Sequence, residues 1–428
     1  MKAKIIPIIV VLIVLVPFFY SCEDATYKEY TGNAPVYMTF EELRSGVSTE
    51  KDVDLTDPGK IYFKDNFIFI VEELKGIHVF DNSDPSSPVK KTFLKVPGTV
   101  DIAISGNILY ADSFVDLVAV DVQDVNNIHE VARVKDIFPY LVPPTGNDYP
   151  MAYVDNKKGV VVEWELKTIK EKIEKINYPY PFYGAKEDIV RFNSQIAASS
   201  SGVSGSGVGV GGSMARFGIK DKVLYILDEN NLKVFDITNK LNPVKVGDFS
   251  PGWGIETMFI TGNTMFMGTT TGMLIYDITI PLSPVSKGRF NHARACDPVI
   301  VDDTLAYVTL RTGTTCGGVR NVLDVVNVKK ITSPVLVSSF ALTNPHGLGK
   351  DGNLLFICDG TAGLKIFDAS NPWQITSHLL YSYPNINAFD VIPLGDVLVL
   401  IGDDGLFQYN YSNLTNISLL SRIDVVKE

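Results

Sequence analysis

At seven positions, a polar or ionisable residue stands just before or within a short apolar segment that ends in a turn such as Gly-Asn or Asp-Asn. Four of these residues are carboxylates, the groups that act as acid and base in glycan hydrolysis when two of them lie about 5–10 Å apart. His346 is the member that titrates near neutral pH. The seven positions are Lys60, Asp101, Arg216, Glu256 or Thr257, Asp297, His346 and Asp390.

Charged residues of both signs stand at the same position of each repeat, in strands that are otherwise apolar. This pattern predicts a ring of polar side chains around a central channel. One interpretation is that the ring binds a ligand or a metal ion. The other is that its members pair with one another and with backbone groups, because buried charges must be paired. We favour pairing and treat the seven positions as ligand-binding candidates. We assign no catalytic residue, metal ligand or cofactor to the sequence.

A repeat must position these residues. Its anchor is an Asp or Asn that ends an alternating strand, and a Pro or Ile follows seven residues later in every copy. The anchors are spaced by 40, 115, 41, 50, 41 and 42 residues. Each copy offers four short strands with turn signals between them. The anchors are Asp81, Asp121, Asp236, Asp277, Asn327, Asp368 and Asn410.

Four strands in a period near 40 residues are the signature of a β-propeller blade. We therefore predict an all-β propeller of antiparallel four-stranded blades, with seven blades preferred and eight next. Asp or Asn at a strand end bonds its own backbone two residues on, so we interpret the anchors as turn formers and not as catalytic carboxylates.

The segments "LKVFDITN…NPVKVG" from Leu232 and "LKIFDASNP" from Leu364 resemble the LVIVD repeat of exported bacterial and archaeal proteins. Together with the N-terminal signal described next, the chain resembles the LVIVD-repeat lipoproteins of Bacteroidetes. The resemblance covers roughly 59–423 and implies a β-propeller. It implies no catalytic motif.

The N-terminus has two lysines and an apolar run, Ile5–Tyr20, which is shorter than the roughly 20 residues of a bilayer span. Residues 19–22, "FYSC", resemble a bacterial lipobox, with Phe19 where Leu is usual. We predict a signal peptide over 1–21 and a lipidated Cys22 that anchors the protein to a membrane. The alternative is ordinary secretion with an incidental cysteine.

A polar tether and lead-in, 22–58, precede the propeller, which we assign to 59–428 with an insertion around 171–213. Within the lead-in, "YMTFEELRSGV" predicts extended chain and a short helix. The last residues, "LLSRIDVVKE", are a candidate strand for closing the ring with the N-terminal part.

The repeat is interrupted before the third clear copy. "PMAYVDNKKGVVVEWELK" from Pro150 predicts a hairpin with its turn at 156–159, in either a worn blade or an excursion from the second blade. The insertion is rich in Tyr and Pro and then in Gly and Ser, without the Gly-Lys-Ser/Thr of a phosphate loop. Its aromatic residues and Trp253 are candidates for stacking on carbohydrate.

Three cysteines follow Cys22, and their spacing fits no metal motif. Cys296 and Cys316 are close enough in sequence for a disulfide, which we do not favour. Cys358 lies in the apolar run "LLFIC", where we expect a buried structural thiol.

The formal net charge of −11 argues against a nucleic-acid partner. We expect a lipid-anchored propeller at the bacterial cell envelope, on the periplasmic or the surface side and most simply at the outer membrane. We expect it to bind a carbohydrate or a protein. The alternative is a glycan-active hydrolase or lyase that uses carboxylates of the polar ring.

Overall fold

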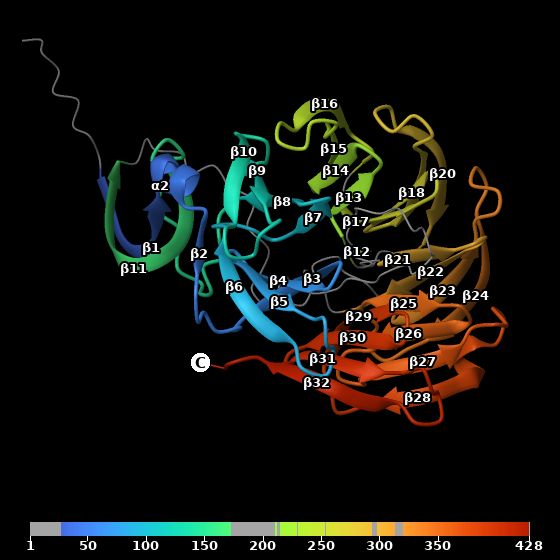
Figure 1. Ribbon diagram of the computed structural model, residues 1–428. Helices are drawn as coiled ribbons and strands as arrows, with labels where there is room; N and C mark the ends of the chain where they lie inside the picture. Colours follow the sequence, from blue (N-terminus) through green and yellow to red (C-terminus); the bar gives the residue numbers. More distant parts are fainter. Residues whose placement is uncertain are drawn as a thin grey trace, which may run out of the picture.

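A computed structural model describes residues 27–172, 210–211, 215–228, 230–252, 254–292, 298–312 and 320–427. Seven four-stranded antiparallel blades form a ring (Figure 1), which confirms the predicted β-propeller and its preferred blade number. Within each blade the four strands are consecutive in sequence, and the first is the innermost. Among the described residues, no helix has the length and apolarity needed to cross a membrane.

The blades are numbered in chain order. Blade 1 holds β3 (Pro58–Lys64), β4 (Phe67–Glu72), β5 (Gly76–Asp81) and β6 (Val89–Lys95). Blade 2 holds β7 (Ile102–Ser105), β8 (Ile108–Ser113), β9 (Asp116–Asp121) and β10 (His129–Val134). Blade 3 holds β13 (Phe217–Lys220), β14 (Val223–Asp228), β15 (Asn231–Asp236) and β16 (Val244–Phe249). Blade 4 holds β17 (Ile255–Thr261), β18 (Thr264–Thr269), β19 (Gly272–Asp277) and β20 (Val285–Asn291).

The remaining blades follow the same plan. Blade 5 holds β21 (Val299–Asp302), β22 (Leu305–Leu310), β23 (Val322–Asn327) and β24 (Val335–Ala341). Blade 6 holds β25 (Leu348–Asp351), β26 (Leu354–Cys358), β27 (Leu364–Asp368), the short 3-10 helix η2 (Ile375–His378) and β28 (Leu379–Tyr383). Blade 7 holds β29 (Ala388–Leu394), β30 (Val397–Gly402), β31 (Gly405–Asn410) and β32 (Ser418–Asp424).

The position of a strand in its blade explains its composition. The second strand β14, "VLYILD", is buried along its whole length because neighbouring blades cover both of its faces. The outermost strand β16, "VKVGDF", is mostly exposed. Each of the five largest apolar clusters joins residues of two or three neighbouring blades, so the core of the protein lies between the blades.

One end of the ring, here called the turn face, carries the connections from first to second strand and from third to fourth strand. The first connection is a tight turn whose first residue has a positive φ of 52–63° in every blade, which suits Gly, Asn and Asp. These residues are Asp65, Gly106, Asp221, Gly262, Asp303, Gly352 and Gly395.

In the second connection the anchor accepts a hydrogen bond from the amide two residues on, at 2.8–3.0 Å in all seven blades. The anchors are therefore turn formers, as their spacing predicted.

The same turns fasten neighbouring blades. Four anchors are followed, four residues on, by a carbonyl that accepts a side-chain hydrogen bond from the preceding blade. The donor–acceptor pairs are Tyr110 Oη to Lys240 O (3.0 Å), Tyr225 Oη to Pro281 O (2.6 Å), Ser338 Oγ to Pro372 O (2.5 Å) and Ser421 Oγ to Pro85 O (2.6 Å).

The C-terminal strand does not close the ring as expected. β32 pairs with β31 and belongs to the same blade as β29. Closure comes instead from apolar packing between blades 7 and 1 and from reciprocal hydrogen bonds between the Asn82 and Gln408 amides, at 2.9 and 2.7 Å. The expectation was wrong because each repeat already supplies four consecutive strands, so no blade lacks one.

The opposite end of the ring, here called the insertion face, carries the connections from second to third strand and from blade to blade. The long connections 135–216 and 311–321 both begin and end there. β12 (Val210–Gly211) pairs with β3 on the inner edge of blade 1, and β2 (Ser48–Glu50) pairs with β6 on its outer edge.

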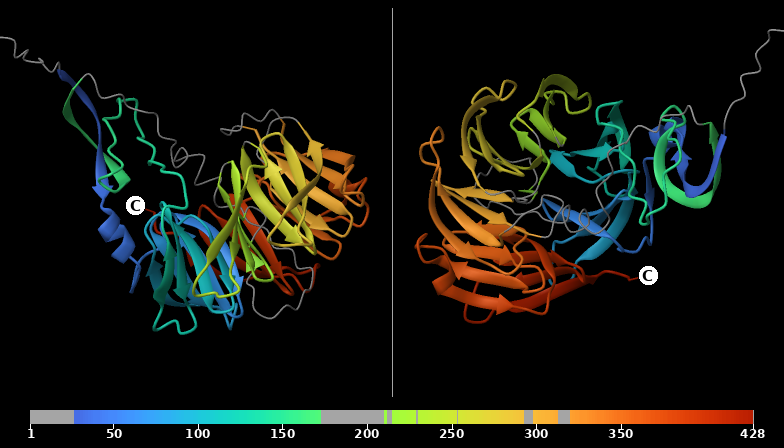
Figure 2. Two further views of the ribbon diagram at one scale, coloured as in Figure 1. Left: turned by 90° about the horizontal axis from the view of Figure 1, so that it is seen from above. Right: turned by 180° about the vertical axis from the view of Figure 1, so that it is seen from behind.

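The N-terminal part and the excursion after blade 2 form an accessory unit beside the ring (Figures 1 and 2). β1 (Tyr27–Met38) pairs antiparallel with β11 (Val160–Lys172) and forms a two-stranded ribbon. The expected hairpin around 150–167 was therefore wrong: the apolar and polar alternation of β11 is satisfied by a partner from the N-terminal segment. The predicted short helix is α2 (Phe40–Ser45).

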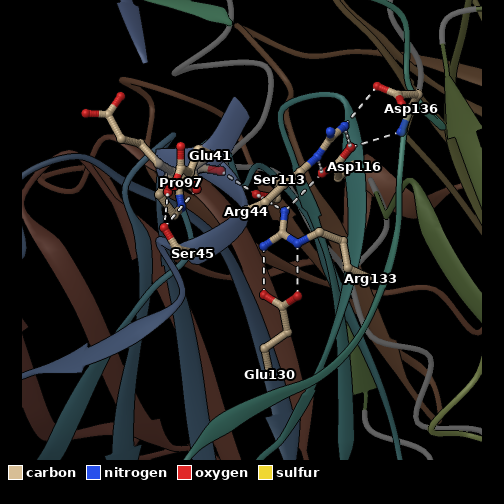
Figure 3. Close-up of polar contacts among 10 residues, drawn as sticks. Glu41, Arg44, Ser45, Pro97, Ser113, Asp116, Glu130, Arg133 and Asp136 are labelled. Carbon is tan, nitrogen blue, oxygen red and sulfur yellow. Dashed lines mark hydrogen bonds and ion pairs between the residues drawn. The ribbon is translucent and has the colours of Figure 1, made fainter. Parts of the chain in front are cut away.

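A buried ion network fastens α2 to blade 2 (Figure 3). Arg44 Nε lies 3.0 Å from Asp116 Oδ2, and Arg44 Nη2 lies 3.1 Å from Asp136 Oδ1. Arg133 Nη1 lies 3.2 Å from the same Asp116 Oδ2, and Arg133 also pairs with Glu130. Burial opposes the charge of Asp116, but these hydrogen bonds outweigh it and lower its pKa. We call the contacts of Arg44 with Asp116 and Asp136 the latch.

Candidate functional site

The described members of the predicted polar ring all lie at the start of an innermost strand, at the insertion-face end of the channel. Lys60, Glu256 and Asp390 are within β3, β17 and β29, whereas Asp101, Arg216 and His346 immediately precede or approach β7, β13 and β25. Cys22, Trp253, Cys296, Asp297, Cys316 and most of the insertion lie outside the described residues.

Asp101 joins three blades. Its Oδ2 accepts hydrogen bonds from Lys60 Nζ of blade 1 at 2.6 Å and from the Arg216 amide at the start of blade 3 at 2.6 Å. Further amides, of Phe217 and Ile102, donate to its two oxygens at 3.2 and 2.8 Å. Lys60 and Asp101 are only 2% and 3% exposed, so each charge depends on the other.

Burial shapes the charges of this cluster. Loss of hydration lowers the pKa of Lys60, and the neighbouring Asp101 opposes that shift. Asp112 Oδ1 accepts hydrogen bonds from the Val100 and Asp101 amides at 2.7 and 3.0 Å. Desolvation nevertheless raises the pKa of Asp112, although these amides and Arg216 act in the opposite direction. Lys60, Asp101 and Asp112 thus build a structural ion cluster.

A second cluster lies across the channel mouth, in blades 5 and 6. Arg311 Nη1 is 3.1 Å from His346 Nε2, and because arginine can only donate, this imidazole edge accepts. His346 is held by its backbone as well: its carbonyl accepts from Thr309 Oγ1 and its amide donates to Cys358 O, both at 2.6 Å. His346 is 1% exposed and packs its ring 5.8 Å from that of Phe389.

Asp390 brings a carboxylate from blade 7 to the same place. It is fully buried beside Gly347, where a Cβ would lie 2.6 Å from its Oδ1, so residue 347 must lack a side chain. Cys358 is also fully buried, as its apolar segment predicted. Burial raises the pKa of this thiol, and the charges of Asp390 and Asp359 add to the effect.

The sequence analysis missed three further buried carboxylates. Each stands at the end of the apolar segment that forms the second strand of its blade, and this position could have identified them. Glu72 accepts hydrogen bonds from the Thr56 and Asp57 amides at 3.2 and 2.9 Å. Asp359 accepts from the Thr343 and Asn344 amides at 3.0 and 2.7 Å and pairs with Lys365. Asp228 pairs with Lys233 in the same way.

A pocket of about 510 Å³ opens where the accessory unit meets the insertion face. Connections of blades 1 and 2 form one wall, the accessory unit a second, and the C-terminal residues a third. The lining is apolar with a few charged groups at its edge. It includes Met38, Leu74, Lys75, Phe114, Val162 and Lys427.

Among the described residues, no group of three His, Cys, Asp or Glu side chains is placed to hold a metal ion. Both carboxylate oxygens of Asp101 accept hydrogen bonds, so this group is not available as a general acid or base. The channel mouth is therefore lined by buried polar side chains, with Arg311, His346 and Asp390 on one side and Lys60 and Asp101 on the other.

Comparison with known proteins agrees with this architecture. Residues 58–93, 98–136, 211–250 and 351–381 match the LVIVD repeat. These segments correspond to blades 1, 2 and 3 and to much of blade 6. No curated protein matches the chain.

Two solved structures share the fold. A functionally unknown protein from Desulfotomaculum acetoxidans DSM 771 has a TM-score of 0.52 at 11% identity, over 84% of this chain and 95% of that one. The computationally designed Ika8 protein has a TM-score of 0.50 at 10% identity, over 88% of this chain and 90% of that one. The chain is thus a repeat-built β-propeller whose repeats are similar to the LVIVD repeat.

Proposed function

We propose that the protein is a lipid-anchored binding module of the bacterial cell envelope and that its insertion face contacts a carbohydrate or protein ligand. The observation that carries this proposal is the difference between the two ends of the ring. The turn face repeats the same two connections in every blade, with η2 added in blade 6, whereas the connections 135–216 and 311–321, the pocket and the accessory unit all lie at the insertion face. Binding surfaces on rigid scaffolds are commonly built from such variable connections.

The enzyme alternative receives less support from the described residues. A glycan hydrolase or lyase needs two carboxyls that face a common cleft. Asp101 is committed to Lys60 and to backbone amides, and Asp390 is fully buried beside Gly347. These contacts favour a scaffold role for both residues.

Membrane attachment is tested by fractionation of cells that express the wild-type chain or Cys22→Ser. We expect the wild-type protein in the membrane fraction with lipid on Cys22, and the variant in the soluble fraction. A variant that stays in the membrane fraction would contradict the lipid anchor.

Binding is tested with the soluble Cys22→Ser chain on a panel of purified polysaccharides and, by cross-linking, on envelope proteins. Lys75→Glu with Lys427→Glu changes the rim of the pocket, and Lys329→Glu with Lys330→Glu is the matched change on the turn face. We expect the first pair to weaken binding about tenfold, because reversing two rim charges changes the electrostatic match with the ligand, and the second pair to leave it unchanged. Equal effects of the two pairs would argue against the insertion face as the binding surface.

A further inference from the structure

The β1–β11 ribbon has one end on the propeller and one end free (Figure 2). Its register runs from Met38 opposite Val160, beside the propeller, to Tyr27 opposite Lys172 at the free end. Nearer the middle, one side is covered by the excursion, through the Asn33–Asn147 amide pair at 2.8 Å and a small apolar cluster. Among the described residues, none covers the end formed by Tyr27 and Lys172 in this way, and Tyr27 is 50% exposed there.

Aromatic and cationic side chains gather at this end. Lys170 Nζ lies 5.5 Å from the ring centroid of Tyr27, and Lys28 Nζ lies 4.8 Å from that of Tyr30. The carboxylate of Glu171 is turned toward the protein, since it accepts hydrogen bonds from Tyr30 Oη at 2.8 Å and from the Tyr153 amide at 2.6 Å. Lys28, Lys170 and Lys172 remain exposed.

Such a set of side chains fits the surface of a bilayer. Tyrosine rings prefer the headgroup level, where one side is apolar and the other is wet. Lysines on long flexible stems reach phosphate oxygens while their methylene groups stay on apolar surface. Glu23 and Asp24 are acidic and Glu29 lies opposite Lys170, but the three exposed lysines give the described end of the ribbon an excess of positive charge for phosphate contacts.

Chain length places this end close to any membrane that holds Cys22. Tyr27 follows Cys22 by five residues. Even a fully extended chain of that length spans only about 18 Å. The polar tether expected at the start of 22–58 is therefore short, because the chain from Tyr27 onward is strand β1.

We infer that the free end of the ribbon, formed by Tyr27, Lys28, Lys170 and Lys172, lies on phospholipid headgroups and fixes the orientation of the propeller relative to the membrane. The inference rests on the proposed lipidation of Cys22 and adds a second contact to it. The occupant of this surface is a lipid bilayer, to which the lysines present their ammonium groups.

The test is amine acetylation of the full-length lipidated protein in phospholipid vesicles, read residue by residue by mass spectrometry. The reference is the Cys22→Ser chain in solution. We expect vesicles to lower the labelling of Lys28, Lys170 and Lys172 about fivefold. Lys157, at the other end of the ribbon, and Lys329, on the turn face, provide internal controls whose labelling should not change.

The outcomes separate the two proposals. Lipid on Cys22 with equal labelling of the ribbon-end lysines in vesicles and in solution would overturn the headgroup contact and leave the anchor intact. A mass that shows no lipid on Cys22 would overturn the anchor and the inference with it. Equal protection of Lys157 and the ribbon end would also overturn the inference, because it would indicate a membrane contact along the whole ribbon.

Discussion

The two faces of the ring are built by different rules. On the turn face, seven anchors make the same hydrogen bond. In four of these turns, a carbonyl four residues after the anchor accepts one neutral hydrogen bond from the preceding blade. On the insertion face, buried ions such as Asp101 and Glu72 hold segments that differ in length and sequence. The turn face is thus stabilised by many repeated hydrogen bonds that each contribute little, and the insertion face by a few ion pairs and charged hydrogen bonds that each contribute more.

The largest effect should follow from breaking the Lys60–Asp101 pair. Asp101→Ala leaves an uncompensated ammonium in the protein interior, which costs about 3–5 kcal/mol of unfolding free energy. Urea denaturation of the Cys22→Ser chain measures the change. Lys60→Met together with Asp101→Asn removes both charges, keeps an oxygen that the backbone amides can donate to, and should recover part of the loss. A loss below about 1 kcal/mol in the single variant would show that solvent reaches this cluster.

Acid should weaken the insertion face through Glu72. Burial raises the pKa of this carboxyl, but hydrogen bonds from His78, Thr56 and Asp57 outweigh burial and lower it to about 2. Its contribution is complete above the ordinary value near 4.5 and is lost as the pH falls toward 2. Glu72→Gln should therefore cost on the order of 2 kcal/mol at pH 7 and nothing near pH 2.

The measurement is the thermal midpoint of both proteins at pH 7, 4.5 and 2. Asp81 on the turn face is the matched control, because hydrogen bonds from Ser83 lower its pKa to about 2 at an exposed site. High salt should reduce the change in thermal midpoint caused by Asp81→Asn, and it should not alter the change caused by Glu72→Gln. A difference in thermal midpoint between Glu72→Gln and wild type that stays the same at every pH would show that the charge of Glu72 does not stabilise the fold.

The smallest effect belongs to a single turn-face bond. Tyr225→Phe removes the hydrogen bond to Pro281 O and leaves the ring in place, which should cost about 0.5–1.5 kcal/mol. The same urea denaturation measures it, and Tyr381→Phe in the outer strand of blade 6 serves as the control. A loss of unfolding free energy as large as that of Asp101→Ala would show that single contacts on the two faces contribute equally to stability.

The repeat could be predicted from the sequence because its signals are local. The anchor at Asp368 and the hairpin turn at Gly352 each need only a few neighbouring residues to be recognised. The pairing of Tyr27 with Lys172 could not be predicted, since neither strand repeats and their partners are far apart in the chain. Asp101 could be placed at the mouth of the channel, but its contact with three blades depends on the geometry of the closed ring.

The latch also determines how the protein bears force. If lipid holds Cys22, as proposed, a pull on the ring is transmitted along the backbone of β1 to α2, where Leu43 is fully buried and Arg44 pairs with Asp116. The next element, β2, is a three-residue edge strand that would peel from β6 under load. The latch would transmit this load to blade 2 before it reaches β2, and would so protect that short strand between the proposed anchor and the ring.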